Sequence, residues 1–194
     1  MLASGILVAA VLYGMGPGFV KVGGWFELFF VNTLGMSFNS GVMVYIIVLA
    51  ASIIWGVYES YTEKNKMRMS ISFVLTIALL GIPFYGHGTS AVIIGIIVIA
   101  FLFFYLSPKM QASMKEKYRV SARTLNTSLL CTMMIVIGYS SYAIIVIRST
   151  ANTPMDQNSP EDIFTLGEYL GREHYGTSPL FYGQAVSSKV ALDV

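Results

Sequence analysis

Charged residues are scarce in this chain of 194 residues. Asp, Glu, Lys and Arg make up only 11% of it, whereas a typical soluble domain contains about 25%. The few charges are clustered, so long uncharged stretches separate them, and 55% of the residues are hydrophobic with a mean hydropathy of +0.68. This composition predicts a polytopic membrane protein rather than a large soluble core.

Cysteine and histidine are also rare, which excludes whole classes of site. The one cysteine, Cys131, lies in an apolar run, so we expect neither a disulfide framework nor a cysteine-based metal site. His87 and His174 are far apart in the sequence, and neither has a partner at a metal-ligand spacing. The net charge is +2 and no basic cluster is dense, so no nucleic-acid partner is expected. Spacing alone identifies no catalytic residue.

Five apolar runs organise residues 1–147 into a transmembrane region. A membrane-spanning helix needs about 20 residues, with a usual range of about 17–25, so the third and fourth runs are short. These two form either two spans or a shallow hairpin around YGHGTS, and we expect two spans. The fold class is therefore all-α, with about five transmembrane helices. The predicted spans are residues 2–19, 41–58, 69–84, 91–106 and 128–147.

Basic residues predict the orientation of these spans. Eight of the 12 lysines and arginines lie in the 59–68 and 107–124 loops. Cytoplasmic loops of membrane proteins are enriched in Lys and Arg, so both loops are expected in the cytoplasm, together with the N-terminus. The 20–40 segment, the 85–90 loop and the C-terminal tail then face outward.

Two outward segments hold candidate site residues. GGWFELFFVN is aromatic and apolar around a single charge, and it predicts a helix within residues 20–34 that lies in the membrane interface. Its Glu27 is either an exposed interfacial carboxylate or faces a cavity, where it can contact a substrate. His87, in the 85–90 loop, is either an ordinary loop histidine at the interface or a residue that contacts a ligand.

Residues 148–194 are expected to begin an outward-facing, extracytoplasmic soluble domain that is α-helical or α/β. A turn-rich link at residues 149–158 comes first. Ser159 as N-cap, Pro160 at the first helical position and Asp162 then predict the start of a helix. Apolar residues follow at helical spacing, and the later stretch SPLFYGQAV has the composition of a strand.

Arg148 ends the fifth span on the outward side, where basic residues are sparse. An arginine there either extends to the lipid headgroups or holds a phosphate through a bidentate contact. A phosphate at this surface would belong to a lipid. Asn152 and Asp156 follow, and their side chains either hydrogen-bond a sugar or peptide or simply form turns. The candidate substrate-binding residues are therefore Arg148, Asn152, Asp156, Glu27 and His87.

Nearly the whole chain resembles a family of large bacterial multi-pass proteins. The family was long a domain of unknown function and is now described as protein O-mannosyltransferase-like. The resemblance is carried by IGYSSYAIIVIRSTANTPMDQNSPEDIFTLGEYLGREHYGTSPLFYGQ (137–184), GPGFVKVGGWFELFFVNTLGMSFNSG (16–41) and GIPFYGHGTSAVIIGI (81–96). It implies a many-span enzyme of the glycosyltransferase C superfamily in the bacterial cytoplasmic (inner) membrane, with its active site on the outward, periplasmic face.

The resemblance also implies a reaction. A sugar of the mannose type would pass from a polyprenyl-phosphate donor to a protein hydroxyl, with no cofactor. The partners would be membrane lipids, the lipid-linked donor and the acceptor protein.

An acidic residue in the first outward loop is the expected base in that superfamily. This sequence resembles the middle spans and the start of the outward domain, and the N-terminal acidic motif is missing from it. We therefore expect an internal fragment that is inactive alone, with the base upstream. The alternative is a non-enzymatic membrane scaffold, or an assembly or export component, whose outward domain binds a partner. A transporter is disfavoured because the spans hold almost no ionisable residues at membrane depth.

Overall fold

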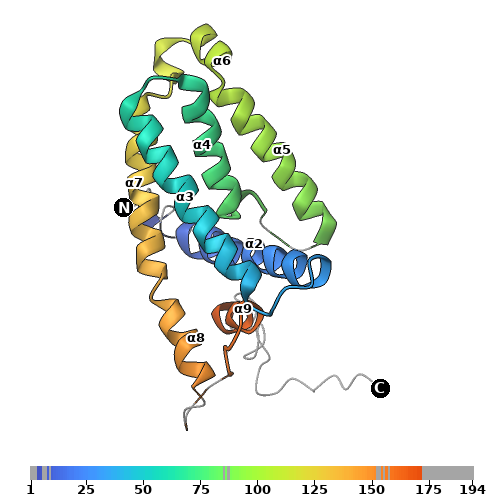
Figure 1. Ribbon diagram of the computed structural model, residues 1–194. Helices are drawn as coiled ribbons and strands as arrows, with labels where there is room; N and C mark the ends of the chain where they lie inside the picture. Colours follow the sequence, from blue (N-terminus) through green and yellow to red (C-terminus); the bar gives the residue numbers. More distant parts are fainter. Residues whose placement is uncertain are drawn as a thin grey trace, which may run out of the picture.

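The computed structural model describes residues 4–5, 8, 10–84, 86, 88–151, 154, 156 and 158–171. All regular secondary structure in this part of the chain is helical (Figure 1), which confirms the predicted all-α class. The strand expected near SPLFYGQAV lies outside the described residues. The elements are η1 (Ala10–Met15), α2 (Gly16–Leu28), η2 (Phe29–Thr33), α3 (Ser40–Thr62), α4 (Lys66–Leu79), η3 (Ile82–Phe84), α5 (Gly88–Leu106), α6 (Pro108–Ser113), η4 (Glu116–Tyr118), α7 (Ala122–Tyr139), α8 (Tyr142–Thr150) and α9 (Ile163–Gly171).

Four described segments are long and apolar enough to cross a membrane. They are Ser40–Thr62, Lys66–Phe84, Gly88–Leu106 and Glu116–Thr150. The two runs predicted as short extend into flanking residues and reach 19 residues each, so each is long enough to cross. The first predicted span, residues 2–19, lies partly outside the described residues, so the crossing at this position stays a prediction. The chain is thus consistent with a multi-pass membrane protein.

The helices divide the molecule into two ends (Figure 1). Helices α3, α4, α5 and α7 run alongside one another, with the 62–66 and 106–122 connections together at the top of the view. We call this the cationic end because it carries the two loops with eight of the basic residues. Helix α2 lies across the opposite end, with α9 beneath it and the last turn of α8 nearby; we call this the α2 end. The two cationic loops therefore lie at the opposite end from α2, α9 and the end of α8, as the orientation prediction requires.

The predicted interfacial segment is longer than expected. Residues 10–33 form one nearly continuous run of helix through η1, α2 and η2, whereas the sequence predicted a span over residues 2–19 and a separate interfacial helix within residues 20–34. Residues 10–19, which the sequence assigned to the first span, are thus continuous with the crosswise helix, and Pro17 lies in the first turn of α2 just after η1. Its crosswise direction under the bundle is compatible with a position in the membrane interface (Figure 1).

A buried tyrosine joins α2, α3 and α4. Tyr45 on α3 has no exposed surface, and its hydroxyl donates a 2.7 Å hydrogen bond to the carbonyl oxygen of Leu79. The rings of Phe19 and Phe26 on α2 lie with their centroids 5.2 and 5.3 Å from the Tyr45 ring. A buried tyrosine hydroxyl needs such a partner, so this contact fixes the end of α4 against both other helices.

Two glycines let α2 cross directly beneath the end of α4. Gly81 follows α4 with a φ of 74°, a conformation that favours glycine. A Cβ added at Gly81 would lie 2.2 Å from the carbonyl oxygen of Gly18, and one added at Gly18 would lie 2.7 Å from that of Leu80. Backbone touches backbone here, as in the small-residue contacts typical of membrane helices.

Candidate functional site

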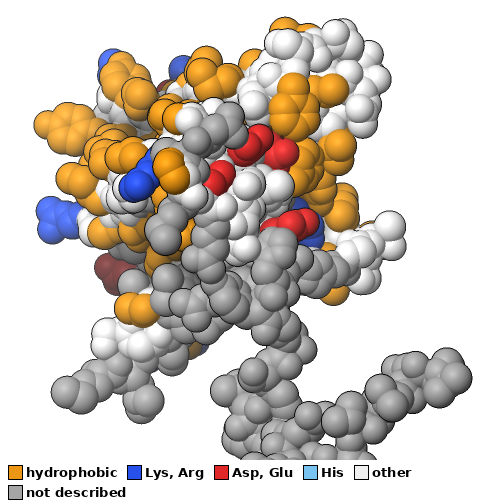
Figure 2. All heavy atoms as spheres, turned by 90° about the horizontal axis from the view of Figure 1, so that it is seen from below, with side chains coloured by type: hydrophobic (Ala, Val, Ile, Leu, Met, Phe, Trp, Pro, Cys, Tyr) orange, Lys and Arg blue, Asp and Glu red, His pale blue; other side chains and the backbone are white. Residues whose placement is uncertain are grey.

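The α2 end is closed by helix α9, which packs against α2. Gly23 and Gly24 of α2 provide the room, since a Cβ added at them would lie 3.4 Å from Ile163 and 3.0 Å from Phe164. Seen from below, the surface of the α2 end has acidic side chains gathered among hydrophobic ones (Figure 2). The C-terminal segment therefore folds back onto α2, so that two packed helices form the surface at the α2 end.

Helix α9 begins three residues later than predicted. Its first residue is Ile163, and the Asp162 carboxylate accepts hydrogen bonds of 2.8 Å from the backbone N–H groups of Phe164 and Thr165. Asp162 is thus the N-cap, and the prediction that Ser159 takes this role is wrong. Ser159 lies before the helix with a φ of 36°, which is far from the extended conformation that an N-cap usually has.

Glu27 caps helix α3. Its two carboxylate oxygens accept backbone hydrogen bonds, from Asn39 at 2.5 Å and from Val42 at 3.0 Å, and the residue is only 1% exposed. The negative charge also lies at the positive end of the helix dipole. Gly41 makes the approach possible, because an added Cβ there would lie 2.5 Å from the Cα atom of Glu27. This capping role explains a carboxylate in an apolar segment, and neither an exposed position nor an open cavity is needed.

Lys21 makes contacts at the α2 end that the sequence did not predict. Its ammonium donates to the carbonyl oxygens of Phe84 at 3.0 Å and Gly86 at 2.5 Å, and it lies 5.7 Å from the ring centroid of Trp25. Trp25 in turn packs edge-on against Phe84. These contacts attach α2 to the connection between α4 and α5. His87 belongs to that connection but lies outside the described residues.

Arg148 lies in the last turn of α8, at the α2 end. Its side chain is exposed and makes no hydrogen bond or ion pair with the described residues. The next residue, Ser149, is 1% exposed and donates a 2.6 Å hydrogen bond to Oδ2 of Asp156. This bond holds Asp156, in the polar segment after α8, against the last turn of that helix. Asp156 therefore lies close to the residue that follows Arg148. Asn152 lies outside the described residues.

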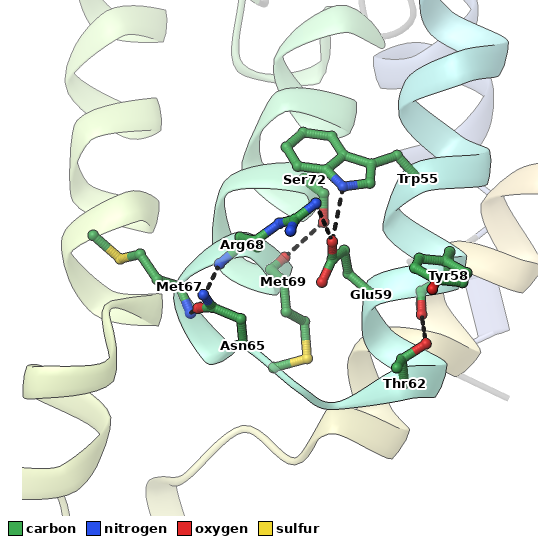
Figure 3. Close-up of polar contacts among 9 residues, drawn as sticks. All are labelled: Trp55, Tyr58, Glu59, Thr62, Asn65, Met67, Arg68, Met69 and Ser72. Atoms are coloured by element: carbon green, nitrogen blue, oxygen red, sulfur yellow. Dashed lines mark hydrogen bonds and ion pairs between the residues drawn. The ribbon is translucent and has the colours of Figure 1, made fainter.

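The cationic end contains a second buried carboxylate, Glu59 (Figure 3). It is 4% exposed, and its Oε1 accepts a 3.1 Å hydrogen bond from Nε1 of Trp55 and a 2.8 Å ion pair from Arg68. Arg68 is 58% exposed and comes from α4, while the other two residues belong to α3. This group joins the two helices at their turn.

The arrangement at the α2 end can bind an anion next to an apolar helix. Lys21 and Arg148 are the cations that this end contributes within the described part of the chain, and the carbonyl oxygens already occupy Lys21. Among the described residues, no group of three or more His, Cys, Asp or Glu side chains is arranged to hold a metal ion. No protein-family model, curated protein or solved structure matches this chain.

Proposed function

We propose that this chain is part of an integral-membrane glycosyltransferase of the protein O-mannosyltransferase-like kind. It would transfer a mannose-type sugar from a polyprenyl-phosphate donor to protein hydroxyls on the outward face of the bacterial inner membrane. The observation that supports this proposal is the position of Arg148, an exposed guanidinium without a described partner at the end of an apolar helix.

A polyprenyl-phosphate has two parts, and α8 offers a complement to each. Ile144 and Ile147 expose 65% and 67% of their surface on α8, so they present an apolar wall to an isoprenoid chain in the bilayer. Arg148 follows directly, where the phosphate of such a lipid would leave the hydrocarbon region. A guanidinium matches phosphate geometry through two parallel hydrogen bonds.

The link after α8 is the proposed position of the sugar or acceptor. Asp156 uses Oδ2 to accept from Ser149, and its Oδ1 has no partner among the described residues. That oxygen can accept a hydrogen bond from a sugar hydroxyl, and Asn152 is proposed to assist. We leave Glu27 out of this group because both of its oxygens already accept backbone hydrogen bonds.

In the proposed reaction, the acceptor hydroxyl attacks the anomeric carbon of the sugar, and the bond from that carbon to the phosphate oxygen breaks. The hydroxyl proton passes to a carboxylate base, which the family resemblance assigns to an upstream loop. Negative charge develops on the departing lipid phosphate, where the guanidinium of Arg148 would stabilise it. Arg148 would thus both bind the donor and assist its departure.

The test is a sugar-transfer assay on the protein isolated from its native membrane, with polyprenyl-phosphate-linked mannose and an acceptor peptide that contains Ser and Thr. Arg148→Ala is expected to lower kcat/KM for the donor by about 10- to 100-fold, because a charge-assisted contact of about 1.5–3 kcal/mol is lost. Arg148→Lys should recover part of it, since the charge remains without the bidentate geometry.

The matched control is Arg123→Ala, which removes an exposed arginine at the cationic end. It should leave donor use unchanged. If the unaltered protein transfers no sugar from any polyprenyl-phosphate donor, the transferase proposal is wrong. If it transfers sugar and Arg148→Ala has the same kcat/KM, only the role of Arg148 is wrong.

A further inference from the structure

A cavity of about 530 Å³ opens at the cationic end, away from the proposed sugar-transfer site. Its volume falls within the range of about 300–1,000 Å³ that is common for small-ligand pockets. The first turns of α4 and α7, the end of α5, and the α6 and η4 connection surround it. The cavity therefore lies where the apolar segments α4 and α5 end, which is the boundary between bilayer and water if they span.

The lower part of the cavity is apolar and its walls are fixed. Met69, Leu106 and Leu125 line it and are each less than one-tenth exposed. The hydroxyl of Ser70 donates a 2.7 Å hydrogen bond to the carbonyl oxygen of Leu106, which joins α4 to α5. Gln111 closes the rim, because it donates to Tyr105 O at 2.9 Å and accepts from Val120 N at 2.9 Å. These hydrogen bonds join the elements that surround the cavity.

Four charges, two of each sign, line the same cavity. Lys66 and Arg119 are the cations, and Glu63 and Glu116 are the anions. Arg119 donates to the carbonyl oxygens of Gln111 and Ala112, both at 3.0 Å. Within the described part of the chain, none of the four is paired with another. The bonds of Arg119 use two of the five N–H groups of its guanidinium, so its other donors remain available, with the other three charges, to a ligand that carries both signs.

The helix ends add to the attraction for a negative group. The N-terminal turns of both α4 and α7 line the cavity. The first turn of a helix carries a partial positive charge because its backbone N–H groups lack intrahelical partners. The Asn65 side chain accepts from Met67 N and Arg68 N, and the Ser121 side chain accepts from Thr124 N. The helix dipole, more than free N–H groups, therefore favours an anion near Lys66. A phosphate is the anion that a membrane surface supplies.

We propose that this cavity binds a zwitterionic phospholipid headgroup that joins a phosphodiester to an ammonium group, as in phosphatidylethanolamine. The phosphodiester lies near Lys66 and Arg119, the ammonium near Glu63 and Glu116, and the glycerol and first acyl carbons over the apolar floor. An anionic phospholipid would satisfy the two cations and leave the two carboxylates opposite a negative ligand. The site therefore selects the zwitterionic headgroup. The proposal does not depend on sugar transfer at the other end.

The experiment is native mass spectrometry of the purified protein, delipidated in detergent and titrated with phosphatidylethanolamine, phosphatidylglycerol or soluble glycerophosphoethanolamine. The unaltered protein should bind phosphatidylethanolamine more tightly than phosphatidylglycerol. Lys66→Gln should weaken binding of both lipids by about two- to fivefold, the effect of removing one exposed charge contact. The double variant Glu63→Gln/Glu116→Gln should keep binding but lose the preference for the zwitterionic lipid.

Lys64→Gln is the matched control, because Lys64 is exposed in the same loop and does not line the cavity. Its binding should equal that of the unaltered protein, and thermal unfolding of every variant checks the fold. Equal binding of the two lipids by the unaltered protein overturns the proposal, as does a Lys66→Gln variant that behaves like the control. If glycerophosphoethanolamine binds as tightly as the lipid, the site recognises a soluble phosphodiester and the lipid assignment is wrong.

Discussion

Removing the Glu27 carboxylate is expected to destabilise the junction between α2 and α3. The two oxygens accept backbone hydrogen bonds of 2.5 and 3.0 Å. A hydrogen bond to a charged group contributes about 1.5–3 kcal/mol to stability. Both donors are only partly buried, so water can replace some of what is lost. We therefore expect Glu27→Ala to lower the free energy of unfolding by about 2–4 kcal/mol.

Glu27→Gln separates the contribution of charge from that of shape. Glutamine keeps the side-chain length and one acceptor oxygen, but its amide N–H group would point towards a backbone N–H donor. The expected loss is about 1–2 kcal/mol, smaller than for alanine. Unfolding can be measured by titrating the protein with SDS in mixed micelles and following tryptophan fluorescence. Trp25 on α2 and Trp55 on α3 report on the helices that Glu27 joins.

Glu161→Ala is the control for this series. Glu161 is exposed at the α2 end, and its side chain makes no hydrogen bond with the described residues. Its replacement should change the free energy of unfolding by no more than about 0.5 kcal/mol, as is usual for surface positions. If Glu27→Ala falls within this same range, the capping account is refuted, because a buried carboxylate with two backbone partners cannot be lost so cheaply.

Two further predictions test the packing and the orientation. Gly81→Ala should lower the free energy of unfolding by at least about 2 kcal/mol. The added Cβ would meet the backbone of α2 at 2.2 Å, and the φ of 74° disfavours alanine. Gly138→Ala is the control: no atom lies within 4 Å of its added Cβ, so it should be neutral or slightly stabilising in the same unfolding assay. The orientation can be tested in a variant that lacks Cys131. Lys109→Cys should react with a membrane-impermeant maleimide only after permeabilisation, whereas Glu161→Cys should react in intact spheroplasts. The opposite pattern would reverse the orientation.

The apolar segments were the most predictable part of the fold. A chain in lipid must satisfy its backbone hydrogen bonds internally, so a long apolar run predicts a helix from local sequence alone. The runs at 41–58 and 128–147 therefore lie within the membrane-length segments Ser40–Thr62 and Glu116–Thr150. Their ends were less predictable, since caps extend helices beyond the apolar residues. The Asn65 side chain, for example, accepts from Met67 N and Arg68 N and begins α4 inside a charged loop.

The candidate site was predictable in residue type and less so in role. Arg148 stood out because a lone arginine follows an apolar run, and the structure places it, exposed, in the last turn of α8. Asp156 was named for its polarity, but its hydrogen bond with Ser149 becomes visible only once the link folds back. The start of α9 was misplaced because Ser159 and Asp162 both fit a helix start, and the backbone conformation decides between them.

The sequence by itself determined the helical class, the apolar segments and the separation of the cationic loops from the polar tail. Each of these follows from composition or from neighbours along the chain. Only the tertiary structure decided what Glu27 and Lys21 do. Glu27 meets the start of α3, 12 and 15 residues away, and Lys21 meets carbonyl groups 63 and 65 residues away. Those partners exist because glycines let α2 touch the backbone of α3 and the end of α4, and such a close approach has no local signature in the sequence.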